Sequence, residues 1–159
     1  MLNFDSDVDR EYAELTENQK QDLIFMLQEE KVARDVYLTL SQKYNARIFK
    51  NISRSEQRHM NAVKSKLDKY KIPLTGYSDE VGAFMDNHFS ELYSSLIQTG
   101  NASLKEAINV GVQIEVLDIK DLKERIPNSV GDVQRMFENL LQGSERHLKA
   151  FNWWAQKFD

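Results

Sequence analysis

The sequence predicts an all-α fold, an antiparallel bundle of four long helices. Its 159 residues include only two prolines and six glycines, so long stretches are free of helix-breaking residues. Apolar residues recur at three- and four-residue spacing in four long segments, as they do on the buried face of a helix. A chain of this length is expected to form one domain, and we expect an extended arm over residues 1–15 and the bundle over residues 16–159.

The first helix is expected to begin after Thr16, which forms a capping-box pattern with Gln19, and to end before Asn45 and Ala46. Glu29 falls about 100° round the helix from its neighbour Glu30, and we expect it to be solvated. The stripe that we expect to be buried consists of Leu23, Met26, Leu27, Glu30, Ala33, Tyr37, Leu40 and Tyr44.

A second helix is expected from about Ile48 to Lys71, before Pro73 and Gly76. The residues from Ile72 to Phe89 show no helical period, and a short helix is expected over about 90–98. Together they predict a long crossover between the second and third long helices. The buried stripe of the second helix is Phe49, Ile52, Glu56, His59, Met60, Val63, Leu67 and Tyr70.

The third helix is expected to begin at a capping box formed by Ser103 and Glu106 and to end at Pro127. Its inward face consists of Leu104, Ile108, Gly111, Glu115, Asp118, Leu122 and Ile126. The fourth helix is expected to begin near residues 128–130, and its inward face consists of Val133, Phe137, Leu140, Ser144, His147, Phe151, Trp154 and Phe158.

Six polar residues lie on these inward faces: Glu30, Glu56, His59, Glu115, Asp118 and His147. An unpaired carboxylate in a core costs several kcal/mol, so four of them require a compensating positive charge. Lysine and arginine do not supply it, because only Arg34 and Arg58 are neighbours of these positions. Two metal cations would supply it, and Glu56 and His59 have the Glu-x-x-His spacing that holds metals in helix bundles.

Composition disfavours several other classes of function. The chain has no cysteine, which excludes disulfides, cysteine-bound metal sites and thiol nucleophiles. Its net charge of -4 and its scattered Lys and Arg residues argue against nucleic-acid binding. Neither a signal peptide nor a segment long enough to cross a membrane is recognisable, so the cytoplasm is the expected location.

The combination of motifs resembles the ferritin-like superfamily, in particular proteins of the rubrerythrin type and a small family of uncharacterised prokaryotic proteins with that fold. Glu30, followed by Ala33-Arg34 and Tyr37, is similar to the first-helix signature. Ser55-Glu56-Gln57-Arg58-His59-Met60 resembles the second-helix motif. Glu115 and Asp118 resemble the paired acidic residues of the third helix.

This resemblance implies a centre of two iron or manganese ions, with zinc as an adventitious occupant. Glu56 and Glu115 are the candidates for bridging both metals, and Glu30 and Asp118 for terminal ligands. His59 and His147 are expected to bind one metal each. The resemblance implies an oxidoreductase that acts on dioxygen, peroxide or ferrous iron, and that needs an external electron donor if it is a peroxidase.

Tyr37 has two interpretations, a hydrogen-bond donor or electron relay beside the metals and a tyrosine of the core. The fourth helix departs from the superfamily pattern, because Ser144 stands where a glutamate is expected three residues before His147. Glu145 points elsewhere and is expected at the surface, as is His88. A metal-binding bundle without turnover and a metal-free interaction protein therefore stay open as alternatives, and a homodimer is one option for the oligomeric state.

Overall fold

The structure, a computed structural model, describes residues 14–158, and this part of the chain is helical without a strand. The all-α fold class is therefore confirmed. The expected arm lies outside the described residues except for positions 14 and 15. The α-helices are α2 (Glu17–Tyr44), α3 (Arg47–Lys69), α4 (Asn87–Gly100), α5 (Leu104–Arg125) and α6 (Gly131–Ala155), and 3₁₀ turns follow at Ile126–Asn128 and Gln156–Phe158.

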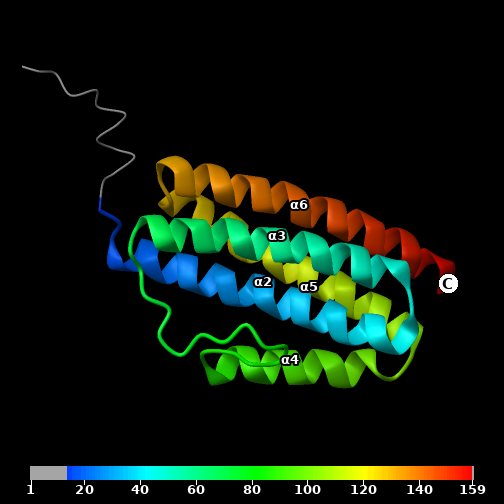
Figure 1. Ribbon diagram of the computed structural model, residues 1–159. Coiled ribbons are helices and arrows are strands. Elements are labelled where there is room, and N and C mark those ends of the chain that lie inside the picture. The colour runs from blue at the N-terminus through cyan, green and yellow to red at the C-terminus, as the bar shows by residue number, and fades with distance from the viewer. Residues whose placement is uncertain (1–13, 159) are drawn as a thin grey trace, which may run out of the picture.

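The four longest helices, α2, α3, α5 and α6, lie side by side (Figure 1). The closest partners are α2 with α3 and α5 with α6, each pair joined by a short connection. Asn45 turns the chain between α2 and α3 in a left-handed conformation, with φ of 46°. The long crossover after α3 leads into α4, which packs against α2 and α5. The predicted position of the crossover is therefore observed.

Side-chain capping explains where α2, α4 and α5 begin. Thr16 and Gln19 form the full capping box, with hydrogen bonds of 2.9 and 3.2 Å, and the Ser103 hydroxyl accepts a 3.1 Å bond from the Glu106 backbone N–H. α4 begins three residues earlier than expected. Asp86 is the reason, because its carboxylate accepts a 3.0 Å hydrogen bond from the Phe89 backbone N–H and caps the helix there.

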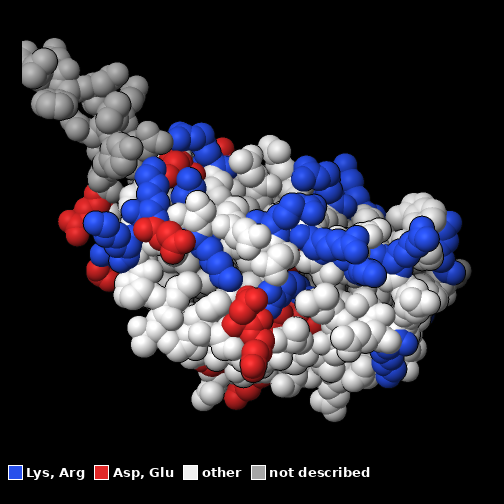
Figure 2. Space-filling view, in the orientation of Figure 1, with Lys and Arg blue, Asp and Glu red and all other residues white. Residues whose placement is uncertain are grey.

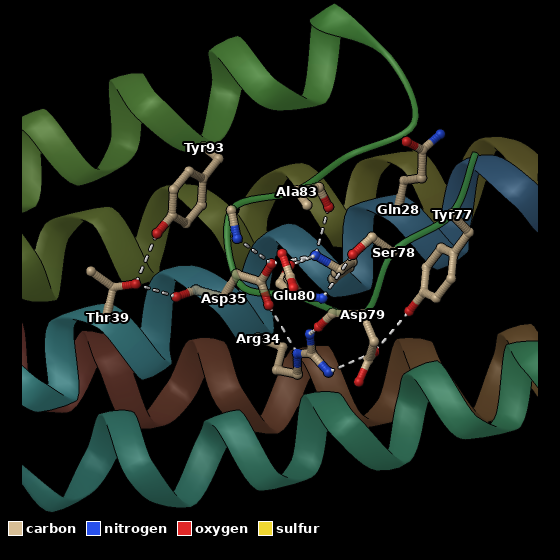
Figure 3. A network of polar contacts seen from close by, with 12 residues as sticks. Gln28, Arg34, Asp35, Thr39, Tyr77, Ser78, Asp79, Glu80, Ala83 and Tyr93 are labelled. Atoms are coloured by element: carbon tan, nitrogen blue, oxygen red, sulfur yellow. Dashed lines mark hydrogen bonds and ion pairs between the residues drawn. The ribbon is translucent and has the colours of Figure 1, made fainter.

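Buried cations of α2 hold the crossover against the bundle (Figure 3). The Lys31 ammonium donates to the Asp35 carboxylate at 2.7 Å and to the carbonyl oxygens of Glu80 and Ala83 at 2.6 and 2.7 Å. Arg34 pairs with Asp35 and with the crossover residue Asp79. The positive charges of Lys31 and Arg34 are thus directed to Asp35 and to the crossover.

The apolar core consists of two clusters, one toward each end of the bundle. One cluster contains Leu23 of α2 and Phe137 of α6, and the other contains Tyr37 of α2 and Phe151 of α6. On each of the four long helices the inward polar residues lie in sequence between the members of the two clusters. A polar layer therefore crosses the middle of the core.

Two further observations concern the outside of the molecule. Trp154, expected in the buried stripe of the fourth helix, is 43% exposed. Its ring packs at 5.1 Å against that of Trp153, which is also exposed, and the buried part of α6 ends one turn earlier, at Phe151. None of the described helices has the length and apolarity required to cross a membrane.

Candidate metal centre

Glu30 of α2 and the Glu-x-x-His pair of α3 meet in the polar layer. The Nδ1 atom of His59 lies 3.1 Å from Glu30 Oε2 and 3.2 Å from Glu56 Oε2. One ligand atom from each of these three residues falls within 4.8 Å of the other two. The three side chains could thus hold one metal ion between α2 and α3.

A second group of the same kind joins α3 to α5 and α6. The Nδ1 atom of His147 lies 2.9 Å from Glu56 Oε1 and 3.4 Å from Glu115 Oε1. Again one ligand atom of each residue lies within 4.8 Å of the others. Glu56 is common to both groups and presents a different oxygen to each histidine, which is the arrangement that a carboxylate bridge between two metals requires.

Two small residues fix the histidine rings. The Nε2 atom of His147 lies 2.8 Å from the Ser55 hydroxyl, so Nδ1 is the atom turned to the carboxylates. Gly143 of α6 makes room for the other ring, because a Cβ at this position would lie 2.6 Å from His59 Nε2. Neither Ser55 nor Gly143 was predicted as a site residue. A glycine inside a helical pattern was the available signal for Gly143, and Ser55 stood in the second-helix motif with no role assigned to it.

Tyr37 and Asp118 lie beside the two groups rather than in them. The Tyr37 hydroxyl is fully buried and donates a 2.8 Å hydrogen bond to Glu115 Oε1. Asp118 is 3% exposed and accepts a hydrogen bond from the hydroxyl of Ser144. The serine that replaces the expected glutamate therefore binds an inward carboxylate of α5.

The layer is rich in buried carboxylates and poor in cations. Glu30, Glu56 and Glu115 are fully buried, and their ion pairs among the described residues run only to His59 and His147. One oxygen each of Glu30, Glu115 and Asp118 is buried without a hydrogen-bond partner. Such orphaned acceptors cost free energy, and a bound cation would satisfy them.

Proton affinities in the layer reflect the same shortage of cations. Burial, together with the neighbouring Glu56, raises the pKa of Glu30 to about 8. Burial alone would lower the histidine values, but the carboxylates raise the pKa of His59 to about 11 and that of His147 to about 9. Burial would also raise the pKa of Glu56, yet its hydrogen bonds hold it below the ordinary value. Without metals, protons bound to the histidines supply the positive charge.

Glu29 was predicted to be solvated, and this prediction is wrong. Its side chain is 4% exposed, and neither of its carboxylate oxygens has a hydrogen-bond partner. Burial and the neighbouring Asp118 raise its pKa to about 12. The reason is that α4 and α5 cover α2 on this side, so that α2 has more than one buried face.

The acidic interior is covered, and the viewed face of the bundle carries both basic and acidic side chains. Figure 2 shows Lys and Arg side chains along α3 and α6 on the viewed face, with Asp and Glu grouped elsewhere on it. Glu145 and His88 are exposed, as expected. The carboxylates of the polar layer are at most 4% exposed and are covered by the helices that carry them.

Comparison with known proteins places this layer within a family domain. Residues 19–156 match a family described as an uncharacterized protein domain, DUF2202. The chain belongs to this family. The match covers nearly all of the described helical part, so the DUF2202 domain includes both groups of candidate ligands.

A relative and a solved structure extend the comparison. The chain is 47% identical over 138 residues to the uncharacterized protein MJ0754 of Methanocaldococcus jannaschii, covering 86% of this chain and 75% of the relative. It is also similar to the crystal structure of hypothetical protein MJ0754 from Methanococcus jannaschii DSM 2661, with a TM-score of 0.88 and 45% identity. That similarity covers 91% of this chain and 83% of the other. The DUF2202 fold is thus shared along most of both chains.

Proposed function

We propose that this DUF2202 protein is a ferritin-like di-metal carboxylate protein of the rubrerythrin type, which holds two iron or manganese ions. The observation that carries the proposal is that Glu56 belongs to both candidate ligand groups. Glu30 and His59 would complete one group, and Glu115 and His147 the other. A donor set of carboxylates and imidazoles suits iron and manganese, and zinc would bind as an adventitious occupant.

The buried carboxylate oxygens that lack a hydrogen-bond partner favour bound metal ions over a purely structural role for the polar layer. Salt bridges to two histidines leave one oxygen each of Glu30, Glu115 and Asp118 without a partner. A metal-free interaction protein would have to bear this cost with no compensating contact. The positive charge of two metal ions would balance the four carboxylates predicted as ligands.

The proposed reaction class is oxidation with dioxygen or peroxide as the oxidant, with ferrous iron as a further substrate. Two bound iron or manganese ions would supply the electrons for reduction of a small oxidant. An external electron donor is part of the proposal for a peroxidase, because the chain has no cysteine to act as a thiol reductant.

The chain's own residues would hold the metal ligands in position and donate hydrogen bonds to them. The Tyr37 hydroxyl holds Glu115 at 2.8 Å and is the nearest proton donor to that carboxylate. Ser55 orients His147, and Ser144 holds Asp118. The apolar clusters on both sides of the layer exclude water from it.

A second candidate is a metal-binding bundle without turnover. The observation that favours it is the hydrogen bond between Ser144 and Asp118, since the superfamily pattern would place a metal-binding glutamate at position 144. Two measurements separate the candidates. Iron and manganese bound to protein purified from its native host test whether there is a metal centre, and oxygen consumption on addition of ferrous iron tests turnover. Bound metal without oxygen consumption would favour the second candidate.

A further inference from the structure

Basic side chains that are scattered in the sequence gather on α3 and α6 in the fold (Figure 2). Six of them are exposed, and none of these six side chains has an ion-pair or hydrogen-bond partner among the described residues. Those on α3 follow one another at three- and four-residue spacing, so they share one side of the helix. We call the six the basic face: Arg47, Lys50, Arg54 and Arg58 of α3, and Arg146 and Lys149 of α6.

Few acidic residues lie near the basic face. The α3 helix contains seven basic and two acidic residues, and one of the acidic residues, Glu56, is buried. The other, Asp68, lies ten residues beyond Arg58, near the end of the helix. The exposed acidic residues of α6 are Glu138 and Glu145. Because the whole chain carries a net charge of -4, the positive potential is local to this face.

The basic face lies where the candidate metal groups come closest to the surface. The side chains of His59 and His147 are 12% and 10% exposed, whereas the carboxylates that they contact are at most 1% exposed. The Nε2 edge of His59 lies against Gly143 of α6, and the Nε2 atom of His147 contacts Ser55 of α3. The outer edges of both rings therefore lie between α3 and α6. Each histidine also has an arginine of the basic face as its neighbour in sequence.

The size of the basic face favours a transient partner. It extends about 17 Å along α3 from Arg47 to Arg58, and two helices side by side are about 20 Å wide. A patch of this size, on the order of a few hundred Å², is smaller than one side of a stable interface, and small interfaces are typical of electron-transfer complexes. Its charge selects a partner with exposed carboxylates, whose association it accelerates.

We propose that the basic face is the docking surface of an acidic protein that donates electrons to the metal centre. The role of the partner rests on the proposed function, because electrons are needed only if the two groups hold metals. Electron transfer slows steeply with distance, and the rings of His59 and His147 are the parts of the two groups nearest to a partner on this face. Reduction of one peroxide molecule to two water molecules consumes two electrons and two protons, so two one-electron donors would be oxidised in turn.

The binding test uses the metal-free full chain, so that its outcome does not depend on the metal centre. The probe is a plant-type ferredoxin, a small acidic protein that donates one electron, and binding is measured by biolayer interferometry. We expect saturable binding at about 20 mM salt that weakens by about tenfold or more at about 200 mM, because salt screens exposed charges.

Two pairs of substitutions assign the docking surface. Arg54→Glu combined with Arg58→Glu should weaken ferredoxin binding by about tenfold or more at low salt, whereas lysine at both positions keeps the charge and should restore it. Lys105→Glu combined with Lys120→Glu makes the same change of charge at exposed positions of α5 and is the matched control.

Electron delivery is measured on the iron-loaded, oxidised protein mixed with reduced ferredoxin in a stopped-flow instrument. Arg54→Glu combined with Arg58→Glu should lower the second-order rate constant by about tenfold or more while the iron content stays unchanged. Lys50→Glu combined with Lys149→Glu reverses charges of the same face and serves in both tests if the first pair does not fold.

Failure of the docking surface is distinguishable from failure of the metal centre. Binding that does not saturate, or that survives charge reversal on the basic face, would overturn the docking surface whatever the metal content. A wild type that docks ferredoxin but binds no iron would overturn the proposed function, and with it the role of the partner as electron donor. Single-stranded DNA that binds more tightly than ferredoxin at about 150 mM salt, and is lost in the same variants, would assign the face to nucleic acid instead.

Discussion

Gly143 of α6 lies directly against the imidazole ring of His59 on α3. A Cβ atom at position 143 would lie 2.6 Å from Nε2 and 2.7 Å from Cε1 of that ring, closer than such atoms approach in folded proteins. The same ring presents its Nδ1 atom to Glu30 and Glu56. The absence of a side chain on one helix therefore determines where a candidate ligand of another helix lies.

Gly143→Ala should reduce metal binding without unfolding the protein. The added methyl group forces the His59 ring away from Glu30 and Glu56, while alanine favours the helix over glycine by about 1 kcal/mol. Metal content measured by mass spectrometry should fall by about one ion per chain, because the group of Glu56, Glu115 and His147 is not touched. Gln142→Ala, at the exposed neighbouring position, is the control and should keep its metal. An unchanged metal content in Gly143→Ala would contradict the assignment of His59.

Tyr37→Phe removes the hydroxyl that donates to Glu115. We expect a loss of about 1–2 kcal/mol in the free energy of unfolding of the metal-free protein, because a buried carboxylate oxygen loses its donor. Urea unfolding followed by circular dichroism measures this change. Tyr44→Phe is the matched control, because it also removes a tyrosine hydroxyl that donates a partly buried hydrogen bond, in this case to the Gly100 carbonyl. Only Tyr37→Phe should alter metal affinity, and an equal effect of both variants would make Tyr37 a core tyrosine alone.

The metal-free protein should become less stable as the pH rises. The pKa of His147 is raised from 6.5 to about 9, so the stability that its protonation contributes is complete below pH 6.5 and is lost as the pH passes 9. His59, raised to about 11, and Glu30, raised from 4.5 to about 8, act in the same direction. We expect a decrease on the order of 1–3 kcal/mol between about pH 6 and pH 9.

Urea unfolding in the presence of a chelator measures this pH dependence. His147→Gln should flatten the curve, because the glutamine cannot take up the proton. Added metal should stabilise the protein most at the alkaline end, where protons compete least for the ligands. A metal-free stability that rises across this range would show that the histidines are not held protonated by the carboxylates.

Ser144→Glu should distinguish an incomplete metal site from a complete one. The new carboxylate would stand beside Asp118 in place of the serine hydroxyl, so the metal-free variant should be less stable, by about 1–3 kcal/mol. With metals present, the additional ligand should tighten binding of the second ion and slow the reaction with peroxide. Titration of ferrous iron followed by calorimetry measures the affinity. A destabilised variant with unchanged affinity and stoichiometry would indicate that Ser144 has a packing role.

The helices and the polar layer were predictable because both follow from the helical period of the sequence. Inward positions recur every three or four residues, and a polar residue at such a position of the sequence, as at Glu30, Glu56 or His147, is conspicuous. Five of the six predicted inward polar residues meet in two groups that share Glu56, and Asp118 lies beside these groups. Whether these residues lie at the same height along the bundle axis depends on how far α2 and α3 are shifted along each other. The pattern of residues in the sequence does not indicate this shift.

The residues that were missed depend on contacts between helices. Glu29 is buried because α4 and α5 cover a second side of α2, whereas the period of α2 alone defines one buried side. Ser55 supports His147 across 92 residues of sequence, a distance at which spacing carries no information. Trp154 follows the period correctly but lies past Phe151, where the burial of α6 ends.

The most direct test of the metal centre is the metal content of the Glu56→Ala variant beside that of the wild type, each reconstituted anaerobically with ferrous iron. The wild type should bind two ions per chain. Glu56→Ala should lose both while keeping its helix content, because Glu56 is common to both groups, and Glu145→Ala, at an exposed position of α6, should keep both. A wild type that binds no iron, or a Glu56→Ala variant that retains two ions, would contradict the proposed centre.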